Sequence, residues 1–185
     1  MAELSKVNTA YILKWEGGLS KNKADTASKD CVPDGSGYHT NKGITWAAWK
    51  SVFGSDIKGF YEMKPEKWLQ VYKRYWAMVE GDLIKSQRIA ELFADWAWAS
   101  GKYSKTEMQN WLNHLGANIK IDGDIGKETL GALNGFIVSK SEKWMFESAY
   151  AWRCEWIKKL RQYPTFGKGW MRRMNDFYLI FSKQN

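Results

Sequence analysis

The sequence contains few of the residues from which metal centres and disulfide frameworks are built. Among its 185 residues are two cysteines, Cys31 and Cys154, and two histidines, His39 and His114. The cysteines are far apart and have no CxxC spacing, so we expect no metal site and no cofactor. The sequence leaves open whether the two thiols stay reduced or form one bridge.

Proline and long apolar runs are also scarce. There are three prolines, and the glycines stand in short clusters, which favours helices joined by tight loops. No apolar run is as long as a membrane span, and the N-terminal residues lack the basic segment and apolar stretch of a secretory signal. We therefore expect no signal peptide and no stable insertion into a membrane.

Tryptophan and positive charge, by contrast, are abundant. The chain has twelve tryptophans and a formal net charge of +8. The charge suggests an anionic partner. However, the basic residues are spread along the chain and no zinc finger, basic zipper or RNA-recognition signature accompanies them, so we expect no nucleic-acid partner. Most of the tryptophans are expected in the core, because burial of aromatic side chains contributes strongly to folding.

The apolar periodicity predicts a mostly α-helical fold. The expected helices cover residues 5–16, 45–54, 65–79, 85–100, 104–115, 127–135, 140–162 and 168–182. The polar residues 19–43 have no sustained period and predict a long loop or a short hairpin after the first helix. A shift in composition near residue 104 predicts an N-terminal region, residues 1–103, and a helical C-terminal region, residues 104–185, packed against it.

Glu16 stands where the first predicted helix meets Gly17 and Gly18. The negative end of a helix dipole disfavours a carboxylate by roughly 0.3–1 kcal/mol, and burial beside Trp15 and its aromatic neighbours would disfavour it further. Both effects favour a carboxyl group that keeps its proton and can donate it, as the hydrolysis of a glycosidic bond requires. The alternative is an ordinary exposed residue at a helix end.

The polar loop supplies partners for such an acid. Glycoside hydrolysis uses a second carboxylate, and Asp25 is a candidate, with Asp30 and Asp34 as rivals in the same loop. The hydroxyl group of Thr40 can position a water molecule. Tyr38 lies in the same polar segment and is suited to stacking on a sugar ring.

Several motifs follow one another in a specific order. They are Trp15-Glu16-Gly17-Gly18, then Ala24-Asp25, then Thr40-Asn41-Lys42-Gly43-Ile44-Thr45, then Phe93-Ala94-Asp95-Trp96-Ala97-Trp98-Ala99-Ser100-Gly101, then Asp122-Gly123-Asp124-Ile125-Gly126, and finally Phe166-Gly167-Lys168-Gly169-Trp170. In this order they resemble the glycoside hydrolase family 108 muramidases with their associated predicted peptidoglycan-binding module. The loop between Asp25 and Thr40 is longer than in the family pattern.

The resemblance implies a lysozyme-like helical fold and cleavage of the β-1,4 bond between N-acetylmuramic acid and N-acetylglucosamine in bacterial peptidoglycan. It implies that Glu16 is the catalytic acid and that Asp25 and Thr40 act on the water molecule. Contacts to the glycan are expected from four further residues, Tyr38, Asn41, Asp95 and Trp96. We expect a monomer that is made in the cytoplasm and acts in the periplasm or cell wall after export or holin-type release.

Two other functions remain open at this point. The chain could be a non-catalytic cell-wall-binding or secretion-accessory protein that keeps the fold, or a basic nucleic-acid-binding domain. The presence of Glu16, Asp25 and Thr40 together favours the enzyme.

Overall fold

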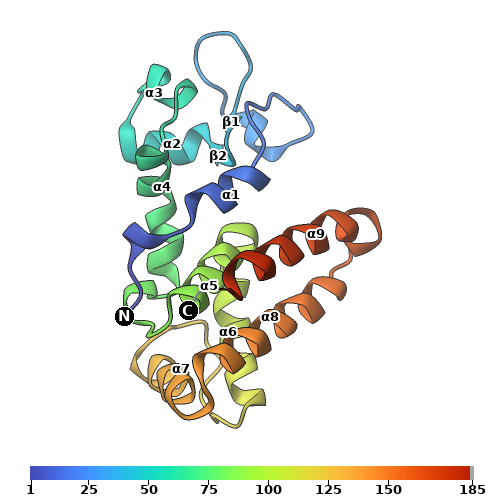
Figure 1. Cartoon of the computed structure of the whole chain (residues 1–185). Coiled ribbons are helices and arrows are strands. Elements are labelled where there is room, and N and C mark those ends of the chain that lie inside the picture. Colours follow the sequence, from blue (N-terminus) through green and yellow to red (C-terminus); the bar gives the residue numbers. More distant parts are fainter. Residues whose placement is uncertain (184–185) are drawn as a thin grey trace. The chain divides into compact units, whose positions relative to one another are not determined.

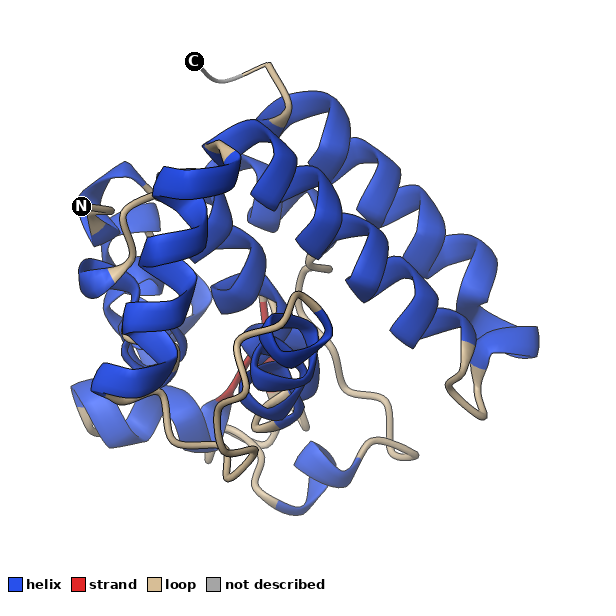
Figure 2. Cartoon of the chain, turned by 90° about the horizontal axis from the view of Figure 1, so that it is seen from below, coloured by secondary structure: helices blue, strands red, loops and turns tan. Residues whose placement is uncertain are grey.

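The computed structural model describes residues 1–183, which form a helical protein with one short hairpin (Figures 1 and 2). The mostly α-helical fold class predicted from the sequence is confirmed. The chain divides into two compact units: one comprises Asn8–Arg74, and the other comprises Met1–Val7 together with the chain from Tyr75 onward. The division into 1–103 and 104–185 stays a prediction.

The first unit contains the N-terminal helices and the hairpin. Its elements are α1 (Thr9–Trp15), a 3-10 turn (Thr26–Lys29), β1 (Thr40–Asn41), β2 (Ile44–Thr45), α2 (Trp46–Phe53), α3 (Ile57–Tyr61) and most of α4 (Pro65–Met78). Phe60 lies at the centre of its core, with its ring centroid 5.3 Å from that of Trp46 and 6.0 Å from that of Trp49, both in edge-to-face contact. Such aromatic pairs contribute beyond their buried area.

The first helix begins later than the sequence predicts. The expected helix over 5–16 is replaced by a 3-10 turn (Leu4–Lys6) and by α1. Asn8 separates the two, because its side-chain oxygen accepts a hydrogen bond from the backbone N–H of Tyr11 at 3.0 Å and so caps α1. The apolar spacing alone does not show this break.

The second unit is a bundle of longer helices. It contains a 3-10 turn (Gly81–Leu83), α5 (Gln87–Ser100), α6 (Tyr103–His114), α7 (Lys127–Lys140), α8 (Glu142–Lys158) and α9 (Tyr163–Phe181). Helix α5 packs against α6 and α8, and α8 also packs against α7 and α9. α9 begins five residues earlier than predicted, and Pro164 lies in its first turn, where a missing N–H has no helical partner to lose.

Asp95 lies in the core of this second unit, where it is 1 % exposed. One of its carboxylate oxygens is 2.8 Å from Arg153 Nη1 of α8, and the other is 2.7 Å from Arg173 Nη2 of α9. Burial raises the pKa of Asp95, but the two guanidinium groups outweigh burial and hold the pKa below its ordinary value. The ion pairs therefore join α5, α8 and α9 through one charged carboxylate.

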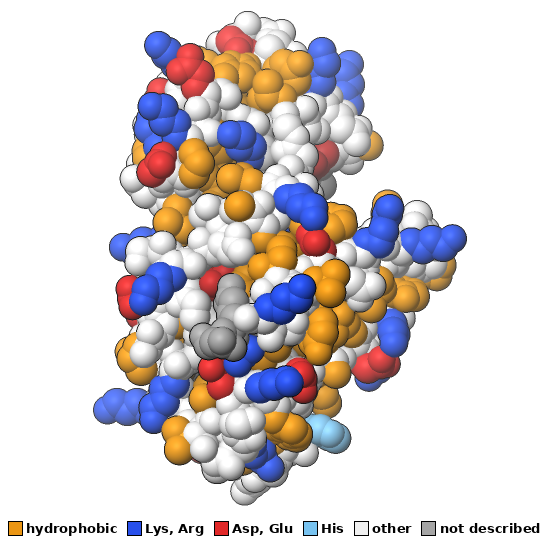
Figure 3. Space-filling model, in the orientation of Figure 1, with side chains coloured by type: hydrophobic (Ala, Val, Ile, Leu, Met, Phe, Trp, Pro, Cys, Tyr) orange, Lys and Arg blue, Asp and Glu red, His pale blue; other side chains and the backbone are white. Residues whose placement is uncertain are grey.

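The face of the molecule drawn in Figure 3 carries its positive charge in scattered positions. Figure 3 shows lysine and arginine side chains spread over the visible face, with aspartate and glutamate among them, rather than gathered in one basic patch. Within residues 1–183, none of the helices combines the length and the apolar character needed to cross a bilayer.

Replacing Asp95 by asparagine removes the carboxylate that Arg153 and Arg173 share. We expect Asp95→Asn to lower the free energy of unfolding by about 3–5 kcal/mol, because buried charges lose their partner. Since the pKa of Asp95 is lower in the folded chain than in the unfolded chain, its stabilisation is present above the ordinary pKa of about 3.9 and is lost as the pH falls through the folded value. Urea unfolding should be measured at a series of pH values from neutral to acidic. The difference in the free energy of unfolding between the unmodified protein and Asp95→Asn should become smaller as the pH falls.

Glu155→Gln is the matched control. Glu155 Oε1 lies 2.6 Å from Lys158 Nζ on the exposed surface of α8. An ion pair at such a position contributes little to the free energy of unfolding. We expect no measurable change in its unfolding midpoint. Equal losses in the two variants would contradict the role given to Asp95.

Candidate active site

Glu16 is the residue that ends α1, as the sequence predicts. Its backbone N–H donates to the carbonyl oxygen of Ile12 at 3.0 Å, which closes the last turn, and the residue is half-buried. Gly17 and Gly18 follow it and are exposed, and a Cβ atom built on either one would meet no atom within 4 Å. The chain therefore leaves open space directly after this carboxyl group.

Thr40 is paired with the segment that follows Glu16. Ser20 and Thr40 form an antiparallel bridge, in which the N–H of Ser20 donates to the carbonyl oxygen of Thr40 at 2.8 Å. The N–H of His39 donates to the carbonyl oxygen of Ser20 at 3.0 Å. The pairing brings the end of the polar loop back to the exit of α1, so two of the predicted catalytic residues lie on paired or adjoining segments.

The imidazole of His39 orients the hydroxyl group of Thr40. His39 is fully buried; its Nδ1 lies 2.9 Å from Thr40 Oγ1, and its Nε2 lies 3.2 Å from the carbonyl oxygen of Asn22. A carbonyl oxygen can only accept, so Nε2 carries the proton; in the neutral ring Nδ1 is then an acceptor, and the hydroxyl of Thr40 donates to it. The lone pairs of Thr40 Oγ1 remain available to accept a hydrogen bond from water.

Sequence reasoning missed this role of His39. The only signal in the sequence was its position next to Thr40, and its contact with Asn22 depends on how the polar loop folds back.

The turn of the β1–β2 hairpin is fixed by side-chain hydrogen bonds. Lys42 and Gly43 both have positive φ, at 48° and 74°, as a tight hairpin turn requires. Lys42 Nζ donates to the carbonyl oxygen of Met63 at 2.5 Å, and Trp68 Nε1 donates to the carbonyl oxygen of Lys42 at 3.0 Å. These two bonds hold a lysine in a backbone conformation that side chains disfavour.

Asn41 braces the same hairpin. It is buried, and its Nδ2 donates to the carbonyl oxygens of Phe60 at 2.7 Å and Tyr61 at 3.3 Å. Its amide group is directed to main chain and not to solvent. We therefore reassign Asn41 from the predicted contact with a glycan to the positioning of the hairpin.

Tyr38 stays at the surface of the polar loop. It is half-buried, its ring is 6.2 Å from that of Tyr61 in an edge-to-face contact, and Lys21 Nζ lies 5.3 Å above its ring. Hydrogen bonds from Ser36 and then from Tyr61 lower the pKa of Asp34 to about 2, so this carboxylate stays charged and braces the loop. A carboxylate that stays charged is unsuited to donate a proton, but Asp34 remains a rival of Asp25 for the role of the second carboxylate.

Asp25 is exposed on the same loop. Its carboxylate accepts a hydrogen bond from the N–H of Ala27 at 2.9 Å and caps the short 3-10 turn. The loop also encloses an open hollow of about 650 Å³ with two lysines in its lining, Lys21 and Lys23. The role of Asp25 toward a water molecule stays a prediction.

Asp95 and Trp96 lie on α5, in the other unit. Asp95 is buried and paired with two arginines, so we reassign it from glycan contact to the stability of the helices. Trp96 is also buried, but it lines a cavity of that unit.

Metal ligands and thiols are the remaining groups that could carry chemistry. Among the described residues no group of three or more His, Cys, Asp or Glu side chains is gathered as a metal site requires. Both cysteines are free thiols. The polar groups placed at the exit of α1 and on the segment paired with it include the carboxyl group of Glu16, the hydroxyl group of Thr40 and the imidazole of His39.

The first unit thus places Glu16 at the end of its first helix, next to open space, and Thr40 on a segment paired with the chain that follows Glu16. Residues 9–101 match the family model Glycosyl hydrolase 108, and residues 104–175 match the model Predicted Peptidoglycan domain. The first match spans half of the chain, and the chain belongs to glycosyl hydrolase family 108.

The fold is also similar to a solved structure. SagA from Brucella abortus superposes with a TM-score of 0.69 at 24% sequence identity, over 98% of this chain and 97% of the SagA chain. None of the curated proteins matches the chain. The matches to the two family models confirm the family resemblance that the motifs predicted.

If His39 acts only by orienting the hydroxyl group of Thr40, replacing His39 should not slow a variant that already lacks this hydroxyl group. We expect Thr40→Val and His39→Ala each to lower kcat on purified peptidoglycan by about tenfold, equivalent to about 1.4 kcal/mol, with a smaller change in KM. The double variant should be no slower than Thr40→Val, because effects transmitted through one group are not additive. Initial rates of reducing-end release test this, with circular dichroism to confirm folding. Fully additive losses would remove the positioning role.

Proposed function

We propose that the protein hydrolyses the β-1,4 glycosidic bond between N-acetylmuramic acid and N-acetylglucosamine in bacterial peptidoglycan, with Glu16 as the general acid. The observation that carries the proposal is the position of Glu16: it is half-buried at the end of α1, beside two glycines that border open space. Membership in glycosyl hydrolase family 108 and the adjoining peptidoglycan domain support the substrate.

The proposed reaction begins with a proton transfer. The carboxyl group of Glu16 donates its proton to the oxygen of the departing sugar, while positive charge develops on the other sugar ring. A water molecule then adds its oxygen to the charged carbon of that sugar ring. The proton that the water releases restores the protonated carboxyl group of Glu16 for the next cycle. With the His39 ring neutral and protonated on Nε2, the hydrogen of Thr40 Oγ1 is directed to His39, and Oγ1 accepts a hydrogen bond from that water and so orients it.

Asp25 is the second carboxylate of the proposal. It stabilises the positive charge on the sugar or activates the water, and its exposed position in the polar loop leaves it accessible to a ligand. We propose further that the enzyme reaches the periplasm or cell wall by export or by release through the membrane, and acts there as a monomer.

Glu16→Gln tests the assignment of the acid. The amide keeps the size of the side chain but cannot donate the catalytic proton, so we expect the rate of peptidoglycan cleavage to fall by about 10²–10⁴-fold. Binding to purified sacculi and the unfolding midpoint should be unchanged. The rate is measured as reducing ends released from sacculi, and a variant that retained most of its activity would show that another group is the acid.

Glu62→Gln is the matched control, because Glu62 also follows the last residue of a short helix, α3, and is exposed. We expect it to cleave peptidoglycan at the rate of the unmodified protein. Equal losses in both variants would point to a general effect of lost charge instead of a specific acid.

Mass spectrometry of the digested peptidoglycan identifies the bond. We expect new reducing ends at N-acetylmuramic acid. Reducing ends at N-acetylglucosamine, or anhydro sugars, would assign a different cleavage to the same site. Saturable binding to sacculi with no new reducing ends from the unmodified protein would instead support the non-catalytic alternative.

A further inference from the structure

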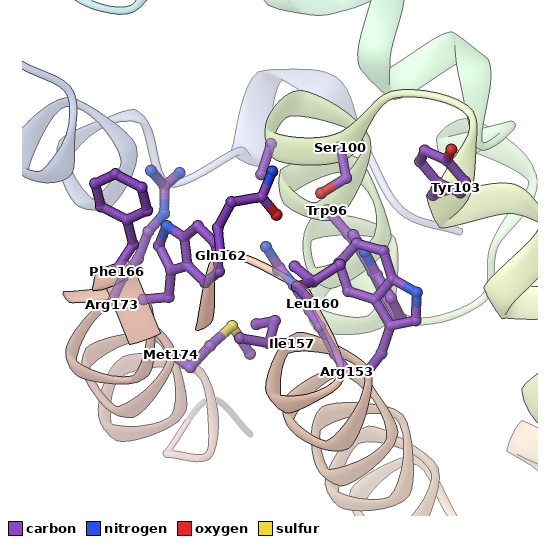
Figure 4. A pocket seen from close by; sticks show the side chains of 13 residues that line it. Trp96, Ser100, Tyr103, Arg153, Ile157, Leu160, Gln162, Phe166, Arg173 and Met174 are labelled. Atoms are coloured by element: carbon purple, nitrogen blue, oxygen red, sulfur yellow. The ribbon is translucent and has the colours of Figure 1, made fainter. Parts of the chain in front are cut away.

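The second unit contains a cavity that the proposed reaction does not use. It has a volume of about 810 Å³, within the range of small-molecule sites, and it opens between the end of α5, the second half of α8 and the first half of α9 (Figure 4). Five aromatic residues contribute to its lining: Trp96, Tyr103, Trp156, Phe166 and Trp170. None of them belongs to the unit that carries Glu16.

The aromatic rings of this cavity are exposed to different degrees. Trp96 is fully buried, whereas Tyr103 is 56% exposed and Phe166 is 54% exposed. The side chains of Trp156 and Trp170 are half-buried. Exposed aromatic rings along a concave surface can be covered by the flat, apolar face of a ligand, and a sugar ring has such a face.

Two buried donors in the lining have no acceptor. Trp96 Nε1 and Arg153 Nε are both buried and form no hydrogen bond within the region of the chain that the structure describes. A buried polar group without a partner costs about 1–3 kcal/mol, and proteins leave such groups rarely. Both residues line the cavity, but neither donor atom reaches its open surface, so the two donors make the wall polar without facing a ligand directly.

The charge of the lining has one sign. It includes Arg153 and Arg173 and no aspartate or glutamate. Asp95, behind the two arginines, compensates some of their charge. The cavity therefore favours a ligand with a carboxylate over a neutral one of the same shape.

We propose that this cavity binds a carboxylate-bearing, N-acetylated sugar pair of peptidoglycan, that is, a muropeptide. The sugar faces cover the exposed aromatic rings, and the negative charge of the lactyl group or stem peptide faces the arginines. The inference rests on the proposed function insofar as it takes peptidoglycan as the polymer that the protein meets. It assigns a second contact with that polymer, outside the residues that cleave it.

Isothermal titration of the full chain with a purified disaccharide–tetrapeptide tests the proposal. This ligand is the product of muramidase digestion and lacks the bond that the proposed reaction cleaves. Binding can therefore be measured whether or not Glu16 is the acid. We expect Trp170→Ala to weaken binding about tenfold, because it removes a ring that the sugar covers. Phe166→Ala, whose side chain is more than half exposed, should weaken binding severalfold without unfolding the protein.

Trp144→Ala is the matched control. Trp144 is a 42% exposed tryptophan of α8 that does not line the cavity, and we expect the affinity of this variant to be unchanged. A neutral N-acetylglucosamine oligomer tests the charge: we expect it to bind several times more weakly, with less dependence on salt.

The proposal is overturned if the disaccharide–tetrapeptide does not bind, if Trp170→Ala and Phe166→Ala bind it as well as Trp144→Ala does, or if the neutral oligomer binds equally well. Each of these results leaves the rate of sacculus cleavage, and with it the proposed function, unaffected. Conversely, a Glu16→Gln variant that still cleaves sacculi would overturn the assignment of the acid and leave the titration as it stands.

Discussion

The carboxylate of Asp95 on α5 faces a guanidinium group from α8 and another from α9, and none of these charges can be left without a partner in the core at small cost. The constraint links segments that match different family models, because α5 belongs to residues 9–101, and α8 and much of α9 belong to residues 104–175. In the folded chain these helices form one compact unit. The same arginines supply the charge of the cavity between them, so the stability of the unit and its proposed ligand depend on one set of contacts.

Local patterns in the sequence predicted most of the helices. Helices α2, α4, α5 and α6 begin and end within about two residues of their predicted bounds, because apolar periodicity and capping residues such as Thr45 and Ser86 are local signals. Helix α3 was missed, since five residues are too few to show a period. The break at Asn8 was missed because the apolar residues on either side of it continue the same spacing.

The candidate site was predictable where a residue's role depends on its neighbours in sequence. The position of Glu16 at a helix end could be predicted from the glycines that follow it. The roles of Asn41 and Asp95 could not, because both depend on long-range partners, the carbonyl oxygen of Phe60 and the arginines of α8 and α9. Most tryptophans were predicted to lie in the core, but only half of the twelve are fully buried: Trp46, Trp49, Trp68, Trp76, Trp96 and Trp111. The cavity could not be predicted, since its lining combines residues from helices far apart in the chain.

Because Ser20 pairs with Thr40, the position of the Thr40 hydroxyl group does not depend on how many residues the polar loop between them contains. The two ends of the loop are fixed to each other by main-chain hydrogen bonds, and β1 is fixed in turn by the hairpin. For a flexible loop, doubling the number of residues between two fixed ends raises the entropic cost of closing the loop by only about 0.6 kcal/mol. The segment between Ser20 and Thr40 can therefore change in length at little cost without displacing the hydroxyl group of Thr40.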